Sequence, residues 1–374
     1  MYSNIYFDNA ATSFPKPPEV ARAMARYLDE LGGPYGRSAY RRAVEVSRTV
    51  EAARDRLAGL LGIARPEFLA FQPNATTGLN LVLQGFLRQG DEVLVSPLEH
   101  NAVLRPLAAL YRLRGITWRT LPADPDGLVR AGDVRRALTS RTRLVVVNHQ
   151  SNVNGLVQPL RKIRKASDGV PLLVDAAQSA GATELRTDDW KLDFVAFTGH
   201  KSLLGPTGTG GVFIRRPEEV EPLIYGGTGS VSESTAMPSF APDVFEAGTG
   251  NIAGIFGLLA AIEHAPTPAH THQEYLAFID AVAALPGITV LRAVDRERQG
   301  NLFSFRHERL DPAVIATSLS ERFGIEVRAG LHCAPLAHQT LGTFPAGTVR
   351  LAPSRLHTPA DFEHVLRALR ELVA

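Results

Sequence analysis

The sequence predicts an α/β fold, in which a large domain with a mainly parallel sheet flanked by helices precedes a smaller α+β domain. Over the first two-thirds of the 374 residues, short apolar runs alternate with amphipathic segments. Strands and helices that alternate at this spacing form parallel sheets. The length suits about two domains. Beyond a Pro-containing stretch at 265–269 the order of elements changes, which indicates a linker.

Strands of the large domain are expected where apolar runs lie between turn signals, at 68–71, 92–96, 117–121, 144–148, 171–174, 194–197 and 211–214. Helices are expected where apolar residues recur at helical spacing, near 18–31, 44–61, 76–88, 102–114, 130–138, 159–167 and 252–264. The short gap between the last two strands allows one antiparallel neighbour.

The smaller domain is expected to contain helices and strands in a different order. They are a helix at 272–284, strands near 288–292 and 301–306, a helix at 312–323, strands near 325–328 and 348–351, and a helix at 359–373. The expected boundaries are 17–264 for the large domain and 265–374, together with 1–16, for the small one.

Composition excludes several classes of protein. A hydrophobic content of 45% and a charged content of 21% are typical of a soluble globular chain. The net charge is +2 and no basic tract is interleaved with aromatic residues, so nucleic acid is not an expected partner. The longest apolar run, 252–262, is far shorter than a membrane span, and the N-terminus lacks the pattern of a secretory signal. We expect a cytoplasmic protein that binds no membrane.

Metal and disulfide chemistry are not expected. The single cysteine excludes an intrachain disulfide framework and a site built from several cysteines. His270 and His272 form an HxH pattern, but no further ligand has convincing spacing. We therefore expect no metal site.

Two charged residues stand at the ends of apolar strands. Lys201 alone among the five lysines directly follows such a strand, DFVAFTG, and Asp175 ends another. Ligands of α/β folds bind at the carboxyl ends of strands. A desolvated lysine there could form a Schiff base. The alternatives are an exposed structural lysine and, for Asp175, an N-cap of a helix from Ala176 onward.

Together, Lys201 and Asp175 suggest pyridoxal phosphate. That cofactor needs a lysine for its aldehyde and a carboxylate for its pyridinium nitrogen. Its phosphate needs a helix N-terminus, and QPNATTGLN (72–80) offers one. Asn and Thr also cap helices for structural reasons, so this last segment alone is a weak signal.

At this point the chain resembles a known family. The blocks DAAQS, FTGHK and RAGLHCA are similar to those of the cysteine desulfurase and selenocysteine lyase group, which are pyridoxal-phosphate enzymes of the class V aminotransferase fold, fold type I. Similar blocks run in the expected order from YFDNAATS to VRLAPS, and RxGxHCA resembles the branch with a short cysteine loop. The resemblance implies a homodimer, L-cysteine or L-selenocysteine as substrate, and a sulfur-acceptor protein or thiol.

The resemblance also implies roles for cofactor-binding residues. Lys201 would hold the cofactor covalently, Asp175 would contact the pyridine nitrogen, and His100 would lie against the ring. The other expected contacts, to the ring hydroxyl and the phosphate, are Gln178, Ala75, Thr76, Thr198, His200 and, from the neighbouring subunit, Thr249. Ala75 is a departure, because relatives commonly show two hydroxyl residues in this turn.

Substrate binding and sulfur chemistry are assigned in the same way. Asn152 and Arg350 would take the substrate carboxylate, for which a planar guanidinium is suited, and Arg328 would line the pocket. The thiolate of Cys333 would attack the sulfur of substrate cysteine, giving alanine and a persulfide on Cys333. Leu331 departs from relatives that carry a second histidine there.

Cys333 also has a simpler interpretation, because free cysteines usually behave as small buried hydrophobes. Gly330, His332 and Pro335 around it indicate a loop instead. Arg328, His332 and His338 lie close in sequence, and any that approach the thiol as cations would favour its thiolate.

Three other functions remain open. A selenocysteine lyase would share nearly every residue. An aminotransferase or β-lyase of the same fold would need Lys201 and Asp175 but not Cys333. A non-catalytic scaffold that binds a sulfur carrier is the alternative of a different class, and the intact lysine, aspartate and cysteine argue against it.

Overall fold

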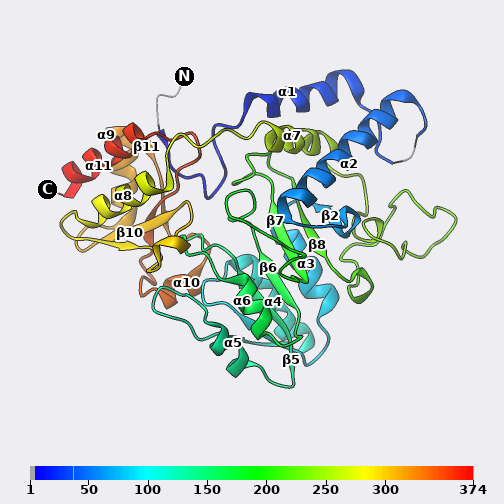
Figure 1. Ribbon diagram of the computed structural model, residues 1–374, viewed down its shortest axis with the longest axis horizontal. Helices are drawn as coiled ribbons and strands as arrows, with labels where there is room; N and C mark the ends of the chain where they lie inside the picture. The colour runs from blue at the N-terminus through cyan, green and yellow to red at the C-terminus, as the bar shows by residue number, and fades with distance from the viewer. Residues whose placement is uncertain (1–4, 37, 374) are drawn as a thin grey trace.

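The computed structural model describes residues 5–36 and 38–373, and its central feature is a seven-stranded sheet (Figure 1). The strand order is β2-β8-β7-β6-β5-β3-β4. The strands are β2 (Leu69–Gln72), β3 (Glu92–Val95), β4 (Thr117–Thr120), β5 (Thr142–Asn148), β6 (Leu172–Asp175), β7 (Phe194–Thr198) and β8 (Gly210–Ile214). β8 is antiparallel to both of its neighbours, and the other pairs are parallel. The one antiparallel neighbour that the sequence allowed is therefore β8.

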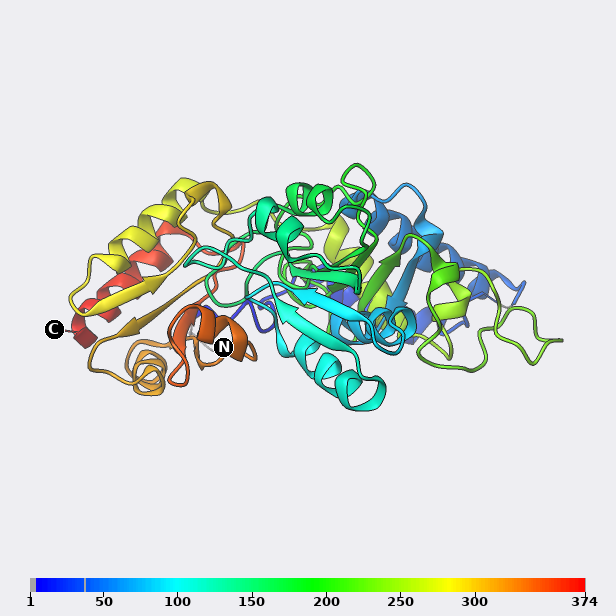
Figure 2. The ribbon, with the colours of Figure 1, turned by 90° about the horizontal axis from the view of Figure 1, so that it is seen from below.

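Helices cover both faces of this sheet, as Figure 2 shows. On one face, side chains such as Leu57 and Ile163 join a core with the strand residue Val145. On the other face, Val82 and Leu107 join a second core. Strands buried on both faces are continuously apolar, as the sequence showed. The first face carries α2 (Arg41–Leu61), α5 (Ala131–Ala137), α6 (Leu160–Ala166) and α7 (Ile252–Glu263), and the second carries α3 (Ala75–Phe86) and α4 (Asn101–Arg114). α1 (Pro18–Arg26) packs on α7.

The C-terminal part forms a second, four-stranded sheet beside the first (Figure 1). Its strands run antiparallel in the order β12 (Arg328–Gly330), β13 (Thr348–Leu351), β10 (Phe303–His307) and β9 (Ile288–Leu291). Phe303 and Phe305 pack in a third core with residues of α8 (His272–Ala283), α9 (Pro312–Phe323) and α11 (Pro359–Val373). This unit is the predicted smaller α+β domain.

The N-terminal segment connects the two parts of the chain. β1 (Ile5–Tyr6) pairs in parallel with β11 (Ile325–Glu326), and Phe7 lies in the third core. A few residues later, the backbone N–H of Ser13 donates to the carbonyl of His200, 2.8 Å away. The segment therefore passes from the small domain to the loop that carries the predicted catalytic lysine.

Some elements differ from the sequence prediction. The strand expected near 325–328 is divided into β11 and β12, and β1 and α10 (Pro335–Thr340) were not predicted. The helix expected over 18–31 continues past α1 as one π-helical stretch, Tyr27–Leu31. Strands of two or three residues, such as β1, are too short to show a period in the sequence. This explains why β1 was not predicted.

Two helix caps place polar groups beside the central sheet. The Asn74 side chain accepts from the N–H of Thr77 at the start of α3, and Nδ1 of His100 accepts from the N–H of Ala102 at the start of α4. Both are standard N-cap arrangements. Among the residues described, no helix is sufficiently long and apolar to cross a membrane.

Candidate active site

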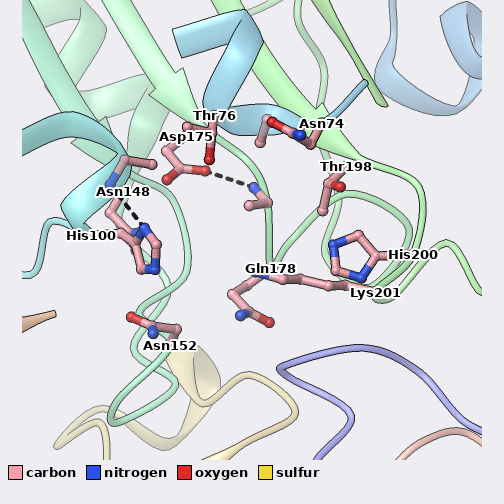
Figure 3. Close-up of a pocket in the computed structure, with 13 residues that line it drawn as sticks. Asn74, Thr76, His100, Asn148, Asn152, Asp175, Gln178, Thr198, His200 and Lys201 are labelled. Carbon is pink, nitrogen blue, oxygen red and sulfur yellow. Dashed lines mark hydrogen bonds between the residues drawn. The ribbon is translucent and has the colours of Figure 1, made fainter. Parts of the chain in front are cut away.

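A pocket lies where β5, β6 and β7 end and where α3 and α4 begin (Figure 3). Its lining residues are Asn74, Ala75, Thr76, His100, Ala102, Asn148, Asn152, Asp175, Ala177, Gln178, Thr198, His200 and Lys201. The fold thus brings together every predicted cofactor-binding residue except Thr249, and it adds the predicted substrate residue Asn152. Parallel strands place their carboxyl ends at one edge of a sheet, which is why residues so far apart in sequence meet here.

Lys201 follows β7 after Gly199 and His200 and reaches into this pocket. Burial lowers the pKa of its ammonium group to about 8, and Asp175 opposes that shift. A lysine with a lowered pKa supplies more of the neutral amine that attacks an aldehyde. The exposed structural lysine considered from the sequence does not fit this environment.

Asp175 is the last residue of β6 and is 3% exposed. Burial raises the pKa of its carboxyl group, while the N–H of Ala177 and the charge of Lys201 act in the opposite direction. Its Oδ1 accepts from the N–H of Ala177 at 2.9 Å. Residues 177–182 form turns rather than a helix, so the helix N-cap alternative for Asp175 is wrong.

The start of α3 provides backbone donors at the same pocket. The first amides of a helix have no partner within it. The Asn74 side chain satisfies that of Thr77, whereas the first amides of the helix also include those of Ala75 and Thr76, two residues that line the pocket. Nδ1 of His200 is buried without a hydrogen-bond partner in the described chain, and burial lowers the pKa of this histidine to about 4. A helix N-terminus suits a phosphate group, and Nδ1 of His200 can add a donor in the tautomer that protonates this atom.

His100 is held in one tautomer by its capping role. Because its Nδ1 accepts from Ala102 at 3.0 Å, the proton of the neutral ring resides on Nε2. Burial lowers the pKa of His100 to about 4, and Lys201 and Arg328 add to that effect. The ring is therefore neutral near pH 7 and presents an N–H donor.

Arg350 lies on β13, is 1% exposed, and is anchored by two groups. Its Nη2 is 2.6 Å from Oδ1 of Asp8, and its Nη1 donates to the carbonyl of Asn152 at 3.1 Å. Nε of Arg350 and Oδ1 of Asn152 are buried without partners in the described part of the chain. The guanidinium is thus fixed and keeps an unused donor.

Asp8 was not assigned a role from the sequence, although it lies in the block YFDNAATS. It precedes Arg350 by 342 residues, so no local pattern connects the two. A buried guanidinium needs a carboxylate partner. This requirement indicates that an acidic residue pairs with Arg350, but it does not identify Asp8.

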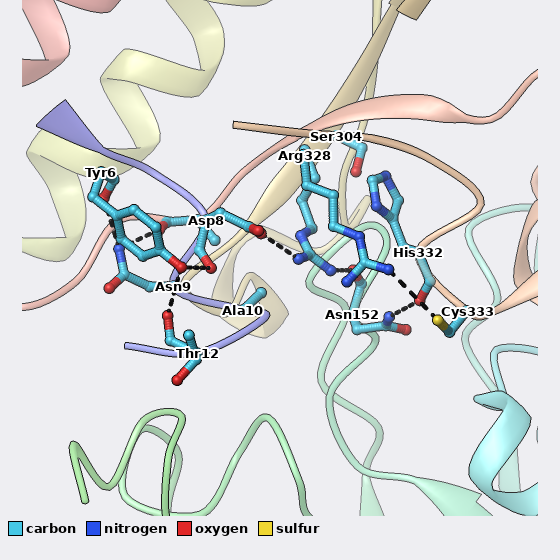
Figure 4. Close-up of polar contacts among 12 residues, drawn as sticks. Tyr6, Asp8, Asn9, Ala10, Thr12, Asn152, Ser304, Arg328, His332 and Cys333 are labelled. Atoms are coloured by element: carbon cyan, nitrogen blue, oxygen red, sulfur yellow. Dashed lines mark hydrogen bonds and ion pairs between the residues drawn. The ribbon is translucent and has the colours of Figure 1, made fainter. Parts of the chain in front are cut away.

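Cys333 is exposed, in the turn between β12 and α10 (Figure 4). Nη2 of Arg328 lies 3.5 Å from Sγ of Cys333, and the carbonyl of Cys333 accepts from the N–H of Asn101 at 2.8 Å. Asn152 donates from Nδ2 to the carbonyl of His332 at 2.7 Å. The thiol is therefore not the small buried hydrophobe of the simpler interpretation, and its turn is tied to the pocket through Asn152.

The two histidines near Cys333 are not cations. Burial is the main cause that lowers the pKa of His332 to about 2 and that of His338 to about 4. Nε2 of His332 pairs with Oγ1 of Thr348, and Nδ1 of His338 pairs with Oγ1 of Thr343. Of the three basic side chains considered from the sequence, Arg328 is the one that contacts the thiol as a cation.

Glu99 is a buried acid that sequence reasoning missed. Its Oε1 accepts from Oγ of Ser96 at 2.7 Å and from the N–H of Asn148 at 2.6 Å. Burial raises its pKa to about 8, and the charge of Asp175 adds to the shift. Glu99 is therefore mostly protonated near neutrality. The sequence around Glu99, between Leu98 and His100, has no pattern that identifies it as a buried acid.

Several predicted residues are not among those that line this pocket, namely Arg328, Arg350, Cys333, Thr249 and His270. Thr249 is exposed and does not line it, and its expected role concerns a neighbouring subunit. Nδ1 of His270 is 2.7 Å from the carbonyl of His357. In the described part of the chain, no group of three or more His, Cys, Asp or Glu could hold a metal ion.

The pocket fits pyridoxal phosphate. An amine with a lowered pKa, a buried carboxylate and a helix N-terminus are the three groups that this cofactor requires. They are present on three elements around one pocket, as Lys201, Asp175 and the start of α3. The unpartnered Nδ1 of His200 would be a further donor for an anion in the tautomer that protonates this atom.

Comparisons with known proteins identify the family of the chain. The family model of class V aminotransferases matches residues 5–365. A probable cysteine desulfurase of Methanothermobacter thermautotrophicus is 36% identical, over 99% of this chain and 94% of that protein. The cysteine desulfurase CsdA of Escherichia coli is 32% identical, over 98% and 93%. The apo structure of a cysteine desulfurase from Thermococcus onnurineus NA1 matches with a TM-score of 0.91 and 30% identity, over 99% of this chain and 94% of that one.

The match spans nearly the whole length of this chain and of its relatives, and it includes both sheets and the turn of Cys333. Such coverage at this identity shows the family and not only the fold. The chain belongs to the class V aminotransferase family, within its group of cysteine desulfurases.

Proposed function

We propose that this protein is a pyridoxal-phosphate-dependent cysteine desulfurase that converts L-cysteine to L-alanine and holds the sulfur as a persulfide on Cys333. The observation that carries the proposal is the contact between the exposed thiol of Cys333 and the guanidinium of Arg328, 3.5 Å apart, on a turn tied to the Lys201 pocket through Asn152. A nucleophilic cysteine needs such access and such a cation.

Residues of the pocket hold the cofactor and the substrate. Lys201 would bind the cofactor covalently, Asp175 would pair with its ring nitrogen, and the amides of Ala75 and Thr76 would hold its phosphate. When bound, the cofactor supplies an electron sink for the carbon skeleton of the amino acid. The free Nε of Arg350 is available to the substrate carboxylate.

Sulfur transfer then involves two sulfur atoms. The thiolate of Cys333 attacks the sulfur of the substrate, and an S–S bond forms as the substrate Cβ–S bond breaks. The electron pair of that bond stays with the carbon fragment, which takes up a proton and leaves as alanine. An acceptor protein or a small thiol removes the outer sulfur of the persulfide by exchange.

The cofactor assignment has a direct chemical test. Borohydride reduction of the purified protein, followed by peptide mapping, is expected to label Lys201. The Lys201→Ala variant serves as the control, because it is expected to give no labelled peptide and no turnover. Label on a peptide without Lys201 would contradict the assignment.

The nucleophile is tested with Cys333→Ser. After brief exposure to cysteine without reductant, mass spectrometry of the wild type is expected to show one added sulfur on the Cys333 peptide. The variant is expected to keep the cofactor and to release almost no alanine from cysteine. If it released alanine at the wild-type rate, Cys333 would not be the nucleophile.

Selenocysteine lyase is the second candidate function. Selenium leaves carbon more readily than sulfur does, so a lyase depends less on the thiol. A Cys333→Ser variant that still cleaves selenocysteine at the wild-type rate would favour this alternative. An aminotransferase or β-lyase would be favoured only if cysteine turnover were also independent of Cys333.

We also propose that the protein works as a homodimer in the cytoplasm. The proposal for a dimer is supported by the exposed position of Thr249, outside the pocket of its own chain, while the cytoplasmic location rests on the sequence alone. Light scattering at assay concentration tests the oligomer, and a fully active monomer would contradict it. Thr249→Val is expected to weaken phosphate binding in the partner's pocket.

A further inference from the structure

His332 and Cys333 have an unusual backbone conformation. Six non-glycine residues of the described chain have positive φ, and only these two follow one another, with φ of 49° and 57°. The left-handed region is unfavourable for residues that carry a Cβ atom. Such residues keep this conformation when surrounding contacts hold them there.

Two hydrogen bonds to the backbone contribute. Nδ2 of Asn152 donates to the carbonyl of His332 at 2.7 Å (Figure 4). The N–H of Asn101 donates to the carbonyl of Cys333 at 2.8 Å. Both donors belong to segments of the large domain. These two hydrogen bonds fix the direction of two successive carbonyl groups but do not involve a side chain of His332 or Cys333.

The side chain of His332 is held by a residue of the four-stranded sheet. Its Nε2 lies 3.0 Å from Oγ1 of Thr348, and the two residues are 2% and 0% exposed. Thr348 pairs with Gly330 across the sheet and precedes Arg350 by two residues on β13. Residues two apart on a strand face the same side. The ring is thus anchored on the face of β13 that carries Arg350.

The ring acts without a charge. Burial, and then the charge of Arg350, lower the pKa of His332 to about 2, so His332 is neutral near pH 7. A neutral ring with a fixed partner does not shuttle protons near pH 7. Its contribution lies in where it places the chain.

We propose that the hydrogen bond between His332 and Thr348 holds the left-handed turn at His332 and Cys333 and thereby sets the position of the thiol relative to Arg328 and Arg350. His332 and Thr348 are then positioning residues for sulfur transfer. The inference rests on the proposed desulfurase function, but the geometry of the thiol can be measured without turnover.

The experiment compares three variants. Thr348→Val removes the hydroxyl and keeps the shape of the side chain, whereas Thr348→Ser keeps the hydroxyl. Thr343→Val is the matched control, because it removes the same kind of partner from His338, whose ring is 5.6 Å from that of His332. The readouts are the single-turnover rate of persulfide formation, the KM for cysteine, and the rate at which iodoacetamide alkylates Cys333.

Thr348→Val is expected to slow persulfide formation about tenfold or more, since misplacing a reacting group by a fraction of an ångström has effects of this order. KM should change little, because Arg350 is untouched. Alkylation at neutral pH should also slow, since the thiol moves away from Arg328. Thr348→Ser and Thr343→Val are expected to stay within about twofold of the wild type for all three readouts.

Two results would overturn the inference: wild-type persulfide and alkylation rates in Thr348→Val, or equal slowing by Thr343→Val. If Thr348→Val does not fold, as judged by thermal unfolding, His332→Leu and His332→Gln repeat the comparison, because only glutamine can still form a hydrogen bond with Thr348. If wild type forms no persulfide while the alkylation rates follow the expected order, the desulfurase proposal fails and the positional inference stands.

Discussion

Nη2 of Arg328 lies 3.5 Å from Sγ of Cys333, while Arg350, directly opposite Arg328 across the sheet, is paired with Asp8. Two arginines at one register position therefore have different surroundings. Arg350 is buried and held, whereas Arg328 is partly exposed and reaches the thiol. Arg350 is therefore suited to hold the carboxylate of the substrate, whereas Arg328 is suited to a role in sulfur chemistry.

Arg328→Met should make Cys333 less reactive. Removing the guanidinium takes away the cation that favours thiolate, and a pair this exposed contributes about two- to fivefold. The measurement is the rate of alkylation by iodoacetamide at pH 7, where Arg328→Lys should be intermediate. Arg306→Met, which changes an exposed arginine on β10, is the control and should react like the wild type. Equal rates in all four proteins would show that Arg328 does not activate the thiol.

Asp8→Ala should impair substrate binding and stability together. The change leaves the buried guanidinium of Arg350 without its 2.6 Å carboxylate partner. Breaking a buried ion pair in this way costs about 3 kcal/mol, measurable by denaturant unfolding. The KM for cysteine should rise about tenfold or more, since an unfixed arginine binds a carboxylate less well.

Asp361→Ala is the comparison for this prediction, because it removes a partly exposed aspartate at the start of α11 that accepts from Thr358. It should lower stability modestly and leave KM unchanged. An Asp8→Ala protein with wild-type KM would show that Arg350 binds the substrate without help from Asp8, or not at all.

Asp175→Asn should keep the fold and lose most of the turnover. The amide oxygen of asparagine can still accept from the N–H of Ala177, but it cannot stabilise a protonated ring nitrogen. The expected loss is about a hundredfold or more in kcat, equivalent to about 3 kcal/mol in the transition state. Visible absorbance checks that cofactor is bound. Near-normal turnover with full cofactor loading would remove Asp175 from the mechanism.

The central sheet and the candidate site residues near it could be predicted because the end of a strand can be recognised from the local sequence. Lys201 and Asp175 each follow an apolar run, and parallel strands bring such ends together without further information. Asp8 and β1 could not be predicted in this way, since their partners lie more than 300 residues away.

The turn of Cys333 shows a second limit of sequence reasoning. Gly330 and Pro335 indicated a loop, but the left-handed conformation falls on His332 and Cys333, where residue preferences argue against it. It is held by long-range hydrogen bonds from Asn152 and Thr348. Conformations that only tertiary contacts impose leave no trace in local propensity.

Glu99→Gln should change how stability depends on pH. Burial raises the pKa of Glu99 in the folded protein to about 8, from an ordinary value of 4.5. Between these values the folded state binds a proton that the unfolded state has released, so the free energy of unfolding falls as pH rises. The contribution is complete below about pH 4.5 and is lost as pH rises through about 8.

Glutamine keeps an acceptor for Ser96 and for the N–H of Asn148 but does not titrate. The buried histidines His149, His100 and His332, whose pKa values are lowered, act in the opposite direction below about pH 6.5. They are common to both proteins and cancel in the difference. From pH 6 to 8, the free energy of unfolding of the wild type should therefore fall relative to that of Glu99→Gln, by at most about 1.4 kcal/mol per pH unit. Denaturant unfolding at four or five pH values measures the difference, and parallel curves would mean that Glu99 is already ionised in the folded protein.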